Sequence, residues 1–333
     1  MRIGVIGTGW VTEHHLNALK NIEGAQVAAI AGRNVGRAKE LGEPWQANAY
    51  ETALPMLQNE SLDAAFILLP PHLHGELERA CSEYVKGVLV EKPIAQSLQT
   101  AQEIGGYFKK AGTIVSVAYQ NRYRQAVLRA KELFSQENGQ GILARAWWTT
   151  EMPPPLWWRN FEQSGGQFVE QCTHLLDICR FTMGEIEDVS AYATRGFMTQ
   201  VDDYSVDDAM VVNARFKSGA LASFATGCFP EGGHDQSPGG GIGISLSSRA
   251  HRVSLEGWGF DGAVYSGQGE TEEIPSEDNI FEIQNRAFLK AVETGDSSSI
   301  LSSYEDGLKT LAATLAANES ARHCGGAPVK VEI

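Results

Sequence analysis

The first residues of the chain constrain its fold more than any other segment. An apolar run at 3–6 leads directly into Gly7, Thr8 and Gly9, and an amphipathic pattern follows. Gly7 permits a tight turn at the end of a strand, and Gly9 lets backbone N–H groups approach a diphosphate at the positive end of the next helix. Thr12 occupies the place of the third glycine that such a pattern normally has. The segment predicts the first strand, turn and helix of a dinucleotide-binding domain.

A glycine turn without a ligand is the alternative interpretation, because a chain with 35 glycines produces such pairs by chance. Gly241 and Gly243 form a pair of this kind. Only the pair at 7 and 9 follows an apolar strand and opens a helix, which is the context that a phosphate-binding turn requires. The position of the first pair therefore favours nucleotide binding.

The first third of the chain alternates short apolar runs with amphipathic stretches, the pattern of a doubly wound parallel sheet. The expected strands are 3–6, 27–31, 64–69, 85–90 and 113–118. The expected helices are 11–21, 35–41, 52–58, 74–82 and 98–109. We therefore expect a Rossmann domain at 1–120.

After about Gln120 the runs become longer and richer in β-branched and aromatic residues, which is typical of an antiparallel sheet. The fold class is α/β, with an N-terminal Rossmann doubly wound parallel sheet and a C-terminal α+β domain at 121–333 that has a large, mainly antiparallel open sheet. A glycine-rich stretch at 231–241 predicts a mobile loop. The expected strands are 142–150, 189–194, 208–216, 220–226, 241–247 and 251–256. One helix is expected to begin after Gly166, and two more are expected at 281–293 and 304–321.

Composition argues against several classes of function. The chain has 333 residues, of which 43% are hydrophobic, and this suffices for two packed domains. Its net charge of -14 repels polyanions, so we expect neither nucleic acid nor an anionic membrane as partner. The five cysteines form no Cys-x-x-Cys pair, which disfavours a metal site and disulfides and fits a reducing cytoplasm. We expect no metal and a cytoplasmic protein.

The end of the second expected strand indicates which dinucleotide binds. A protein that binds NAD normally places an acid there, which accepts hydrogen bonds from the ribose 2′-hydroxyl. This chain has Gly32, Arg33 and Asn34 instead. The guanidinium of Arg33 suits a 2′-phosphate, and Arg37 is a second cation one helical turn later. NADP is therefore favoured over NAD, and the alternative is that Arg33 is a solvated surface charge.

Five motifs extend this pattern along the whole chain. They are Glu91-Lys92-Pro93, Trp157-Trp158-Arg159, Ser164-Gly165-Gly166, the run from Glu170 to Asp177, and the run from Ser303 to Leu308. In this order they resemble the glucose-fructose oxidoreductase, inositol dehydrogenase and MocA (Gfo/Idh/MocA) family. The resemblance implies an NAD(P)-dependent dehydrogenase or reductase that acts on CH–OH groups. It also implies a homodimer or homotetramer that pairs through exposed sheet faces.

The resemblance implies three catalytic residues. Lys92 would lie beside the nicotinamide, where its charge stabilises an alkoxide, and the bond before Pro93 is expected to be cis. Glu170 takes the place of the family's aspartate, and His174 matches the family's histidine. Positions i and i+4 of a helix share one face, so both side chains can reach one hydroxyl, where an imidazole suits a general base. His174 as a satisfied core residue is the alternative.

The glycine turn, the strand ends and the resemblance together define two sets of expected contacts. Substrate contacts are expected at Lys92, Arg122, Trp158, Arg159, Glu170 and His174. Cofactor contacts are expected at Gly7, Thr8, Gly9, Trp10, Val11, Arg33, Asn34, Arg37, Leu69, Pro70, His74, Glu91, Lys92 and Asn121.

Several of these residues have an alternative structural role. Asn121 and Arg122 can instead make interdomain hydrogen bonds, and the tryptophans at 157 and 158 can form a hydrophobic plug. Asp177 either faces substrate or pairs within its helix, and the second is favoured. His72 and His74 have no acidic or cysteine partner at metal-ligand spacing, so we expect them to pack in a loop beside the cofactor.

These expectations combine into one predicted function. It is reversible hydride transfer between NADP(H) and a secondary alcohol or ketone of a sugar, cyclitol or related polyol. Two other functions are compatible with the fold, namely a nucleotide-dependent glycosidase that oxidises C3 transiently and a non-catalytic NAD(P)-sensing regulator. The absent ribose acid disfavours the glycosidase, and the presence of Lys92 and His174 disfavours the regulator.

Overall fold

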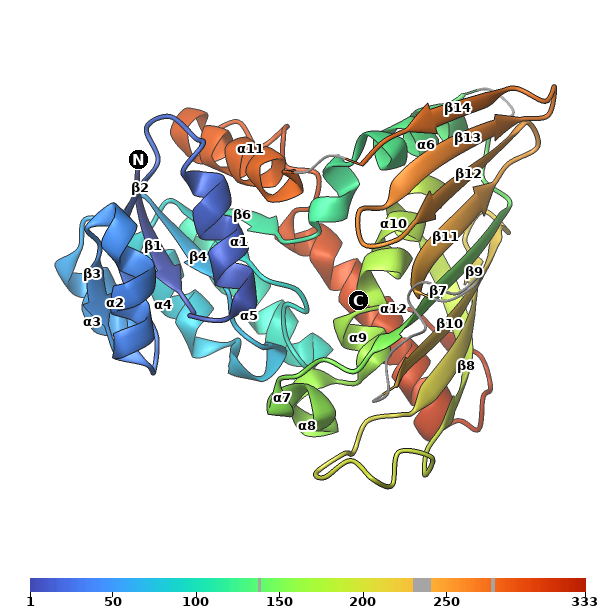
Figure 1. Ribbon diagram of the computed structural model, residues 1–333, viewed down its shortest axis with the longest axis horizontal. Helices are drawn as coiled ribbons and strands as arrows, with labels where there is room; N and C mark the ends of the chain where they lie inside the picture. Colours follow the sequence, from blue (N-terminus) through green and yellow to red (C-terminus); the bar gives the residue numbers. More distant parts are fainter. Residues whose placement is uncertain (137–138, 230–240, 277–278) are drawn as a thin grey trace. The chain divides into compact units, whose positions relative to one another are not determined.

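The computed structural model describes residues 1–136, 139–229, 241–276 and 279–333. The chain forms two compact units (Figure 1). Unit 1 comprises Met1–Gln120 and Asn279–Leu308, and unit 2 comprises Asn121–Asp278 and Lys309–Ile333. The expected loop at 231–241 lies, except for its last residue, outside the described residues. Within the described part of the chain, no helix is both long and apolar enough to cross a bilayer.

Unit 1 contains a six-stranded parallel sheet of order β3-β2-β1-β4-β5-β6. The order reverses between β1 and β4, and in doubly wound sheets ligands bind at the carboxyl ends of the strands beside this point. The short edge strand β3 was not expected from the sequence. The strands are β1 (Arg2–Ile6), β2 (Gln26–Ala31), β3 (Asn48–Tyr50), β4 (Ala64–Ile67), β5 (Gly87–Val90) and β6 (Ile114–Val117).

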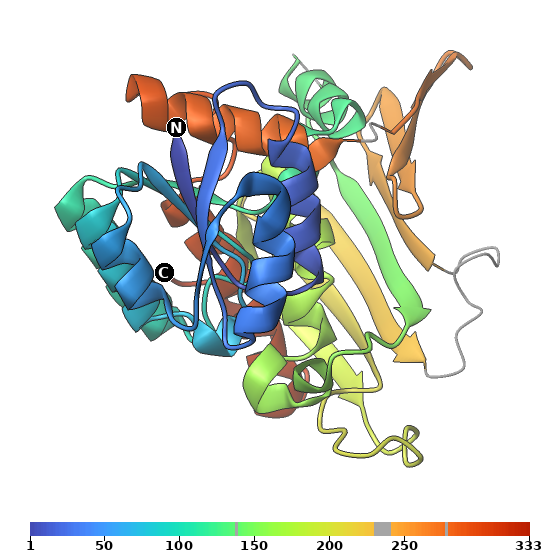
Figure 2. The ribbon, with the colours of Figure 1, turned by 60° about the vertical axis from the view of Figure 1, so that its left-hand side comes forward.

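Helices cover both faces of this sheet, as the strongly apolar strands require (Figures 1 and 2). One face packs against α1, α2 and α11, and the other against α3, α4 and α5. The helices are α1 (Trp10–Leu19), α2 (Val35–Gly42), α3 (Ala53–Asn59), α4 (Glu76–Tyr84), α5 (Leu98–Ala111) and α11 (Ile280–Thr294), with short 3-10 turns at η1 (Glu43–Trp45) and η2 (Pro71–Leu73).

The helix α11 belongs to unit 1 although it lies far along the chain. Phe288 is fully buried, and its ring meets Phe66 of β4 edge to face at a centroid distance of 5.5 Å. At Gly87 of β5, a Cβ atom would lie 2.2 Å from Val292 Cγ2, so glycine is required for this close approach. Unit 1 is therefore not the continuous segment 1–120 that the sequence suggested. It also includes residues 279–308, which pack against the first sheet.

Unit 2 contains a nine-stranded mixed sheet of order β14-β13-β12-β11-β7-β10-β9-β8-β15. Its neighbouring strands are antiparallel except for the parallel pair β7 and β10. The strands are β7 (Leu143–Glu151), β8 (Ile186–Thr194), β9 (Ala209–Phe216), β10 (Leu221–Phe229), β11 (Gly241–Ser247), β12 (His251–Glu256), β13 (Asp261–Ser266), β14 (Thr271–Ile274) and β15 (Val329–Lys330). Both sheets confirm the expected fold class.

Helices cover one face of the second sheet (Figure 1). Alternate residues such as Trp148 and Phe224 point into the core, whereas Leu143, Val211 and Leu221 on the opposite face are 42%, 51% and 53% exposed. The period of two along each strand explains this division. The helices are α6 (Gln125–Ser135), α7 (Leu156–Arg159), α8 (Phe161–Ser164), α9 (Gln167–Glu170), α10 (Thr173–Met183) and α12 (Tyr304–Arg322), with a 3-10 turn at η3 (Gln120–Tyr123).

Replacing Phe288 by alanine should destabilise unit 1 by about 3–5 kcal/mol, because the fully buried ring leaves a cavity against the sheet. The free energy of unfolding from urea denaturation measures this loss. Ile283→Ala is the matched control on the same helix, where the side chain is 39% exposed. A urea midpoint for Phe288→Ala equal to that of the control would contradict the assignment of α11 to this core.

Candidate active site

The glycine turn after β1 has the geometry that a dinucleotide requires. Gly7 has φ of +121°, and its N–H donates to the Ala31 carbonyl oxygen at 2.9 Å. A Cβ atom at Gly7 would lie 2.2 Å from the Leu68 carbonyl oxygen. At Gly9, the N-cap of α1, no side chain caps the helix and a Cβ would meet no atom within 4 Å. The first turn of α1 therefore presents its backbone to open space, as an anion site does.

The neighbours of the two glycines complete this end of the site. Trp10 is 72% exposed, and its ring lies edge-on to His14 at a centroid distance of 4.2 Å. Burial and the adjacent His15 lower the pKa of His14. Thr8 packs against Gly32, where a Cβ would lie 2.6 Å from Thr8 Cγ2. Gly32 thus brings the ends of β1 and β2 close together, and Val11 on the same turn is half-buried.

The two expected arginines at the end of β2 are in different environments. Arg33 is exposed, and its guanidinium forms no ion pair with any residue that the structure describes. Arg37 forms ion pairs with Glu13 and Glu40. Asn34 caps α2, since its Oδ1 accepts a hydrogen bond from the Arg37 N–H at 3.0 Å. Arg33 is therefore the cation that is available to a ligand, and Arg37 is already neutralised.

The loop after β4 is held together by a buried histidine. His74 Nδ1 lies 2.5 Å from Glu78 Oε1, and Nε2 lies 3.2 Å from the Leu69 carbonyl oxygen. Burial alone would lower the pKa of His74, but the Glu78 carboxylate outweighs it and the pKa is raised. Both ring nitrogens are thus engaged, so His74 shapes the backbone at Leu69 and Pro70. No group of three or more potential ligands in the described segments could hold a metal ion.

The Glu-Lys-Pro motif directly follows β5, at the carboxyl edge of the first sheet. The bond between Lys92 and Pro93 is cis, as expected. Lys92 is half-buried, and its backbone N–H donates to Glu91 Oε2 at 3.0 Å. The Glu91 side chain is 7% exposed, and its other oxygen lies 3.8 Å from His15 Nε2. The Glu91 carboxylate therefore fixes the backbone of Lys92 at the point where the chain leaves the sheet.

Glu170 and His174 of unit 2 do not share the regular helix that their spacing suggested. The helix α9 ends at Glu170, and α10 begins at Thr173. The Cys172 N–H donates to the Gln167 carbonyl oxygen, five residues back, so the helical turn is widened between the two side chains. The expected i and i+4 geometry is therefore wrong in detail, because this break changes the angle between the two positions.

The surroundings of these two side chains are aromatic. Trp158 Nε1–H donates to Glu170 Oε2 at 3.1 Å, and Trp158 is only 1% exposed. The His174 ring, which is buried, stacks on Trp148 with a centroid distance of 6.2 Å. Trp158 thus acts as the buried plug of the alternative interpretation, and it orients Glu170 in addition. The neighbouring Arg159 is half-buried, and its Nε has no hydrogen-bond partner among the residues described.

Three further candidates form contacts inside unit 2. Arg122 donates two hydrogen bonds to Asp177, at 2.7 and 2.6 Å, and both side chains are buried. The Thr310 hydroxyl donates to the same carboxylate at 2.8 Å. The sequence favoured a partner for Asp177 within its own helix, but its hydrogen bonds run to residues outside α10, and within the helix Arg180 lies at 4.0 Å. Arg122 is thus engaged by Asp177. Asn121 Oδ1 accepts a hydrogen bond from Arg124 Nε at 2.8 Å.

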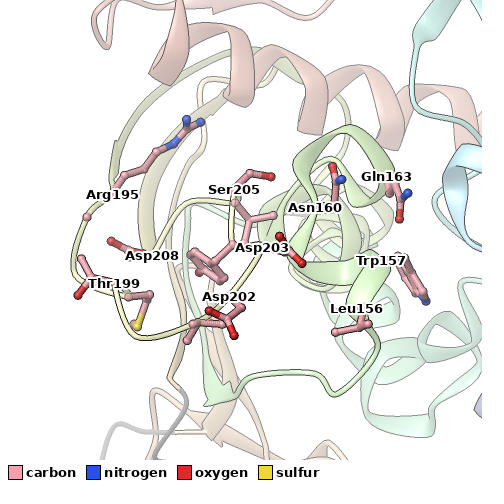
Figure 3. Close-up of a pocket in the computed structure, with 15 residues that line it drawn as sticks. Leu156, Trp157, Asn160, Gln163, Arg195, Thr199, Asp202, Asp203, Ser205 and Asp208 are labelled. Atoms are coloured by element: carbon pink, nitrogen blue, oxygen red, sulfur yellow. The ribbon is translucent and has the colours of Figure 1, made fainter.

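A cavity of about 990 Å³ in unit 2 was not expected from the sequence (Figure 3). It lies between the α7 and α8 region and the segment that joins β8 to β9. The proposed catalytic residues Glu170 and His174 do not line it. Of the motifs singled out from the sequence, the tryptophan motif contributes Trp157 to its lining, but most of its wall comes from the connection between β8 and β9, which has no apolar periodicity. Its lining includes Leu156, Trp157, Asn160, Gln163, Arg195, Asp202, Asp203 and Asp208.

Comparison with known proteins assigns both units to one family. The model described as "Oxidoreductase family, NAD-binding Rossmann fold" matches residues 1–119. The model described as "GFO/IDH/MocA C-terminal domain" matches residues 127–238. The chain belongs to the GFO/IDH/MocA oxidoreductase family. This membership confirms the expected family and the expected class of enzyme.

Relatives within the GFO/IDH/MocA family include two inositol dehydrogenases. Myo-inositol 2-dehydrogenase of Thermotoga maritima is 31% identical over 224 residues, which is 66% of each chain. Scyllo-inositol 2-dehydrogenase (NAD(+)) of Bacillus subtilis is 30% identical over 246 residues, 71% of this chain and 69% of the relative. These matches thus span about two thirds of the relatives. A probable dehydrogenase from Thermotoga maritima has a similar structure, with 26% identity, a TM-score of 0.82 and 99% of each chain covered.

Alanine substitutions at Gly7 and at Gly9 should have different effects, one on stability and the other on affinity for the nucleotide. Gly7→Ala meets the Leu68 carbonyl and requires positive φ, so we expect it to lower the free energy of unfolding by about 1–3 kcal/mol or more. Gly9→Ala meets no protein atom and should leave that free energy nearly unchanged, while its methyl group lowers the affinity for a dinucleotide. Urea denaturation and cofactor titration measure the two effects. Equal cofactor affinity in wild type and Gly9→Ala would refute the placement of the diphosphate.

Proposed function

We propose that this chain transfers a hydride between NADP(H) and a secondary alcohol or ketone of a sugar, cyclitol or related polyol. The observation that carries the proposal is the Glu91–Lys92 turn at the carboxyl end of β5, held by a hydrogen bond within a Rossmann unit. The named activities of the two inositol dehydrogenases support the same class of substrate. A lysine at this edge of the sheet suits a reaction in which negative charge develops on a substrate oxygen.

The residues of unit 1 fit a dinucleotide. Gly7 and Gly9 with Thr8, Trp10 and Val11 would hold the diphosphate, because a Cβ at Gly9 would fill the space in front of α1. Leu69, Pro70, Glu91 and Lys92 would line the path to the nicotinamide at the strand ends, and Asn121 of unit 2 is a further proposed contact. The nicotinamide supplies or accepts the hydride when it is bound.

The remaining steps belong to side chains of the protein. In oxidation, the Lys92 ammonium would stabilise the alkoxide that forms when the substrate hydroxyl loses its proton; in reduction, it would stabilise the negative charge that develops on the carbonyl oxygen. His174 takes the hydroxyl proton in oxidation and returns it in reduction, a role that suits an imidazole near neutral pH. Glu170, which Trp158 holds, orients a substrate hydroxyl. Arg159 is a half-buried guanidinium whose Nε has no partner among the described residues, which favours contact with a hydroxyl or a carboxylate of the substrate.

NADP is the proposed cofactor because Arg33 is exposed and available at the end of β2. The name of the Bacillus subtilis relative specifies NAD(+), so the proposed preference rests on the residues of this chain. A cytoplasmic location follows from the pattern of cysteines in the sequence. The proposal includes a homodimer or homotetramer, which the family resemblance implies and which the exposed apolar residues on the open face of the second sheet, such as Val211 and Leu221, support.

Neutral substitutions of the two catalytic groups should slow turnover. We expect Lys92→Met and His174→Gln each to lower kcat by about 10²–10⁴-fold, because they remove the alkoxide partner and the general base. Nicotinamide absorbance with a panel of sugars, cyclitols and sugar acids measures the rates. Lys86→Met and His323→Gln, at exposed positions, are the matched controls.

Two results would contradict the proposed function. One is wild-type protein that is inactive over the whole panel with both cofactors, and the other is Lys92→Met with the kcat of wild type. Cleavage of a nitrophenyl glycoside with tightly retained NAD would instead support the glycosidase. Ligand binding without any turnover would support a regulator.

Replacing Arg33 by aspartate should reverse the preference for the cofactor. We expect the affinity for NADPH to fall by at least about tenfold, because a charge-assisted contact to the 2′-phosphate is lost and a like charge replaces it. The affinity for NADH should rise, since a carboxylate accepts hydrogen bonds from the ribose hydroxyls. Arg37→Gln should have a smaller effect, because Glu13 and Glu40 already neutralise Arg37. Unchanged NADPH affinity in Arg33→Asp would exclude this role for Arg33.

A further inference from the structure

A group of buried polar side chains lies behind Lys92, within unit 1. His15 of α1 and Asn285 of α11 are both fully buried, and Glu91 is 5% exposed. His15 Nδ1 lies 2.9 Å from Asn285 Oδ1, and His15 Nε2 lies 3.8 Å from Glu91 Oε1. The other Glu91 oxygen accepts the backbone N–H of Lys92 at 3.0 Å. One continuous set of contacts therefore joins α11 to the lysine turn.

Two aromatic rings and a hydrogen bond fix the orientation of the His15 ring. Its edge meets the rings of Phe66 and Phe281, at centroid distances of 5.5 and 5.0 Å. The Asn285 amide oxygen can only accept a hydrogen bond, so His15 Nδ1 is the donor. Nε2 then faces the carboxylate of Glu91 within ion-pair distance, without a hydrogen bond to any described residue, and it attracts the carboxylate when it too carries a proton. The packing thus presents one particular nitrogen to Glu91.

A buried carboxylate is costly unless neighbouring groups hold it. Among the described residues, the Lys92 N–H and the His15 ring lie beside the Glu91 carboxylate, and the charge of Glu91 also helps to raise the pKa of the buried His74. Rotation of the Glu91 side chain would release the Lys92 N–H. The position of this carboxylate therefore controls the backbone from which the Lys92 side chain extends.

We propose that His15 is a positioning residue for Lys92, which acts by holding the Glu91 carboxylate against the Lys92 backbone. The inference rests on the proposed role of Lys92 in hydride transfer. It gives α11 a function beyond packing, because Asn285 on that helix orients His15. A helix from late in the chain thereby sets the geometry of a motif near position 92.

Two amide substitutions separate the two sides of the His15 ring. The amide nitrogen of asparagine approximates Nδ1, and that of glutamine approximates Nε2. His15→Asn therefore keeps the contact with Asn285 and loses the one with Glu91, whereas His15→Gln keeps the contact with Glu91. We expect His15→Asn to lower kcat by about 10–100-fold, the effect of a small misplacement of a catalytic group, with KM changed less. His15→Gln should restore most of the lost rate.

A second readout does not depend on turnover. Amide hydrogen exchange of the 89–93 segment, followed by mass spectrometry, reports the Lys92 N–H, and Pro93 contributes no amide. We expect faster exchange at Lys92 in His15→Asn, near wild-type exchange in His15→Gln, and an NADPH dissociation constant within about threefold of wild type in both. His14→Asn, on the same helix, is the matched control and should leave this exchange unchanged.

The outcomes separate the positioning role from a structural one and from the proposed function. Wild-type kcat and wild-type exchange at Lys92 in His15→Asn would overturn the inference. The inference would also be overturned if kcat fell equally in His15→Asn and His15→Gln, in proportion to the decrease in their melting temperatures. That result would indicate a purely structural role. If the wild type proves inactive on every substrate, the proposed function fails, and the exchange at Lys92 still decides whether His15 holds this turn.

Discussion

The architecture of unit 1 depends on the close approach of two strand ends that only glycine permits. At Gly7, the backbone has φ of +121° and lies so near the Leu68 carbonyl that any Cβ would overlap it. This approach joins the ends of β1 and β4, the two strands between which the order of the sheet reverses. The first turn of α1 and the lysine turn after β5 both begin at this carboxyl edge of the sheet. This steric constraint thus shapes the edge of the sheet at which we propose that the dinucleotide binds.

Several buried charged groups of the described residues are paired, and these pairs tie distant segments of the sequence together. In unit 2, Asp177 accepts hydrogen bonds from Arg122 and from Thr310, which lie far apart along the chain. In unit 1, Glu91 and His15 connect β5 to α1. Because an unpaired buried charge is strongly unfavourable, such pairs specify one arrangement of the surrounding helices. The polar groups around the candidate site are therefore part of its framework.

Local patterns in the sequence predicted five strands of the parallel sheet and most inner strands of the second sheet, and the cis bond before Pro93 was expected together with the family resemblance. They missed the edge strands β3, β14 and β15, which are short, and the inner strand β13, whose apolar run covers only 263–265. They also missed the break between α9 and α10, because a widened turn leaves no mark in the spacing of Glu170 and His174. The burial of Trp158 and the return of α11 to unit 1 depend on partners distant in sequence. Periodicity cannot reveal such partners.

The division of the chain between the two units has a consequence for biosynthesis. Unit 1 consists of Met1–Gln120 and Asn279–Leu308, so its core includes a helix that the ribosome makes more than 150 residues after the last strand of the sheet. Until α11 has emerged, the apolar surface around Phe66 and Gly87 has no cover. The nascent N-terminal segment is therefore a natural client for chaperones that recognise exposed apolar surface. An isolated fragment that ends at Gln120 would leave this apolar surface exposed.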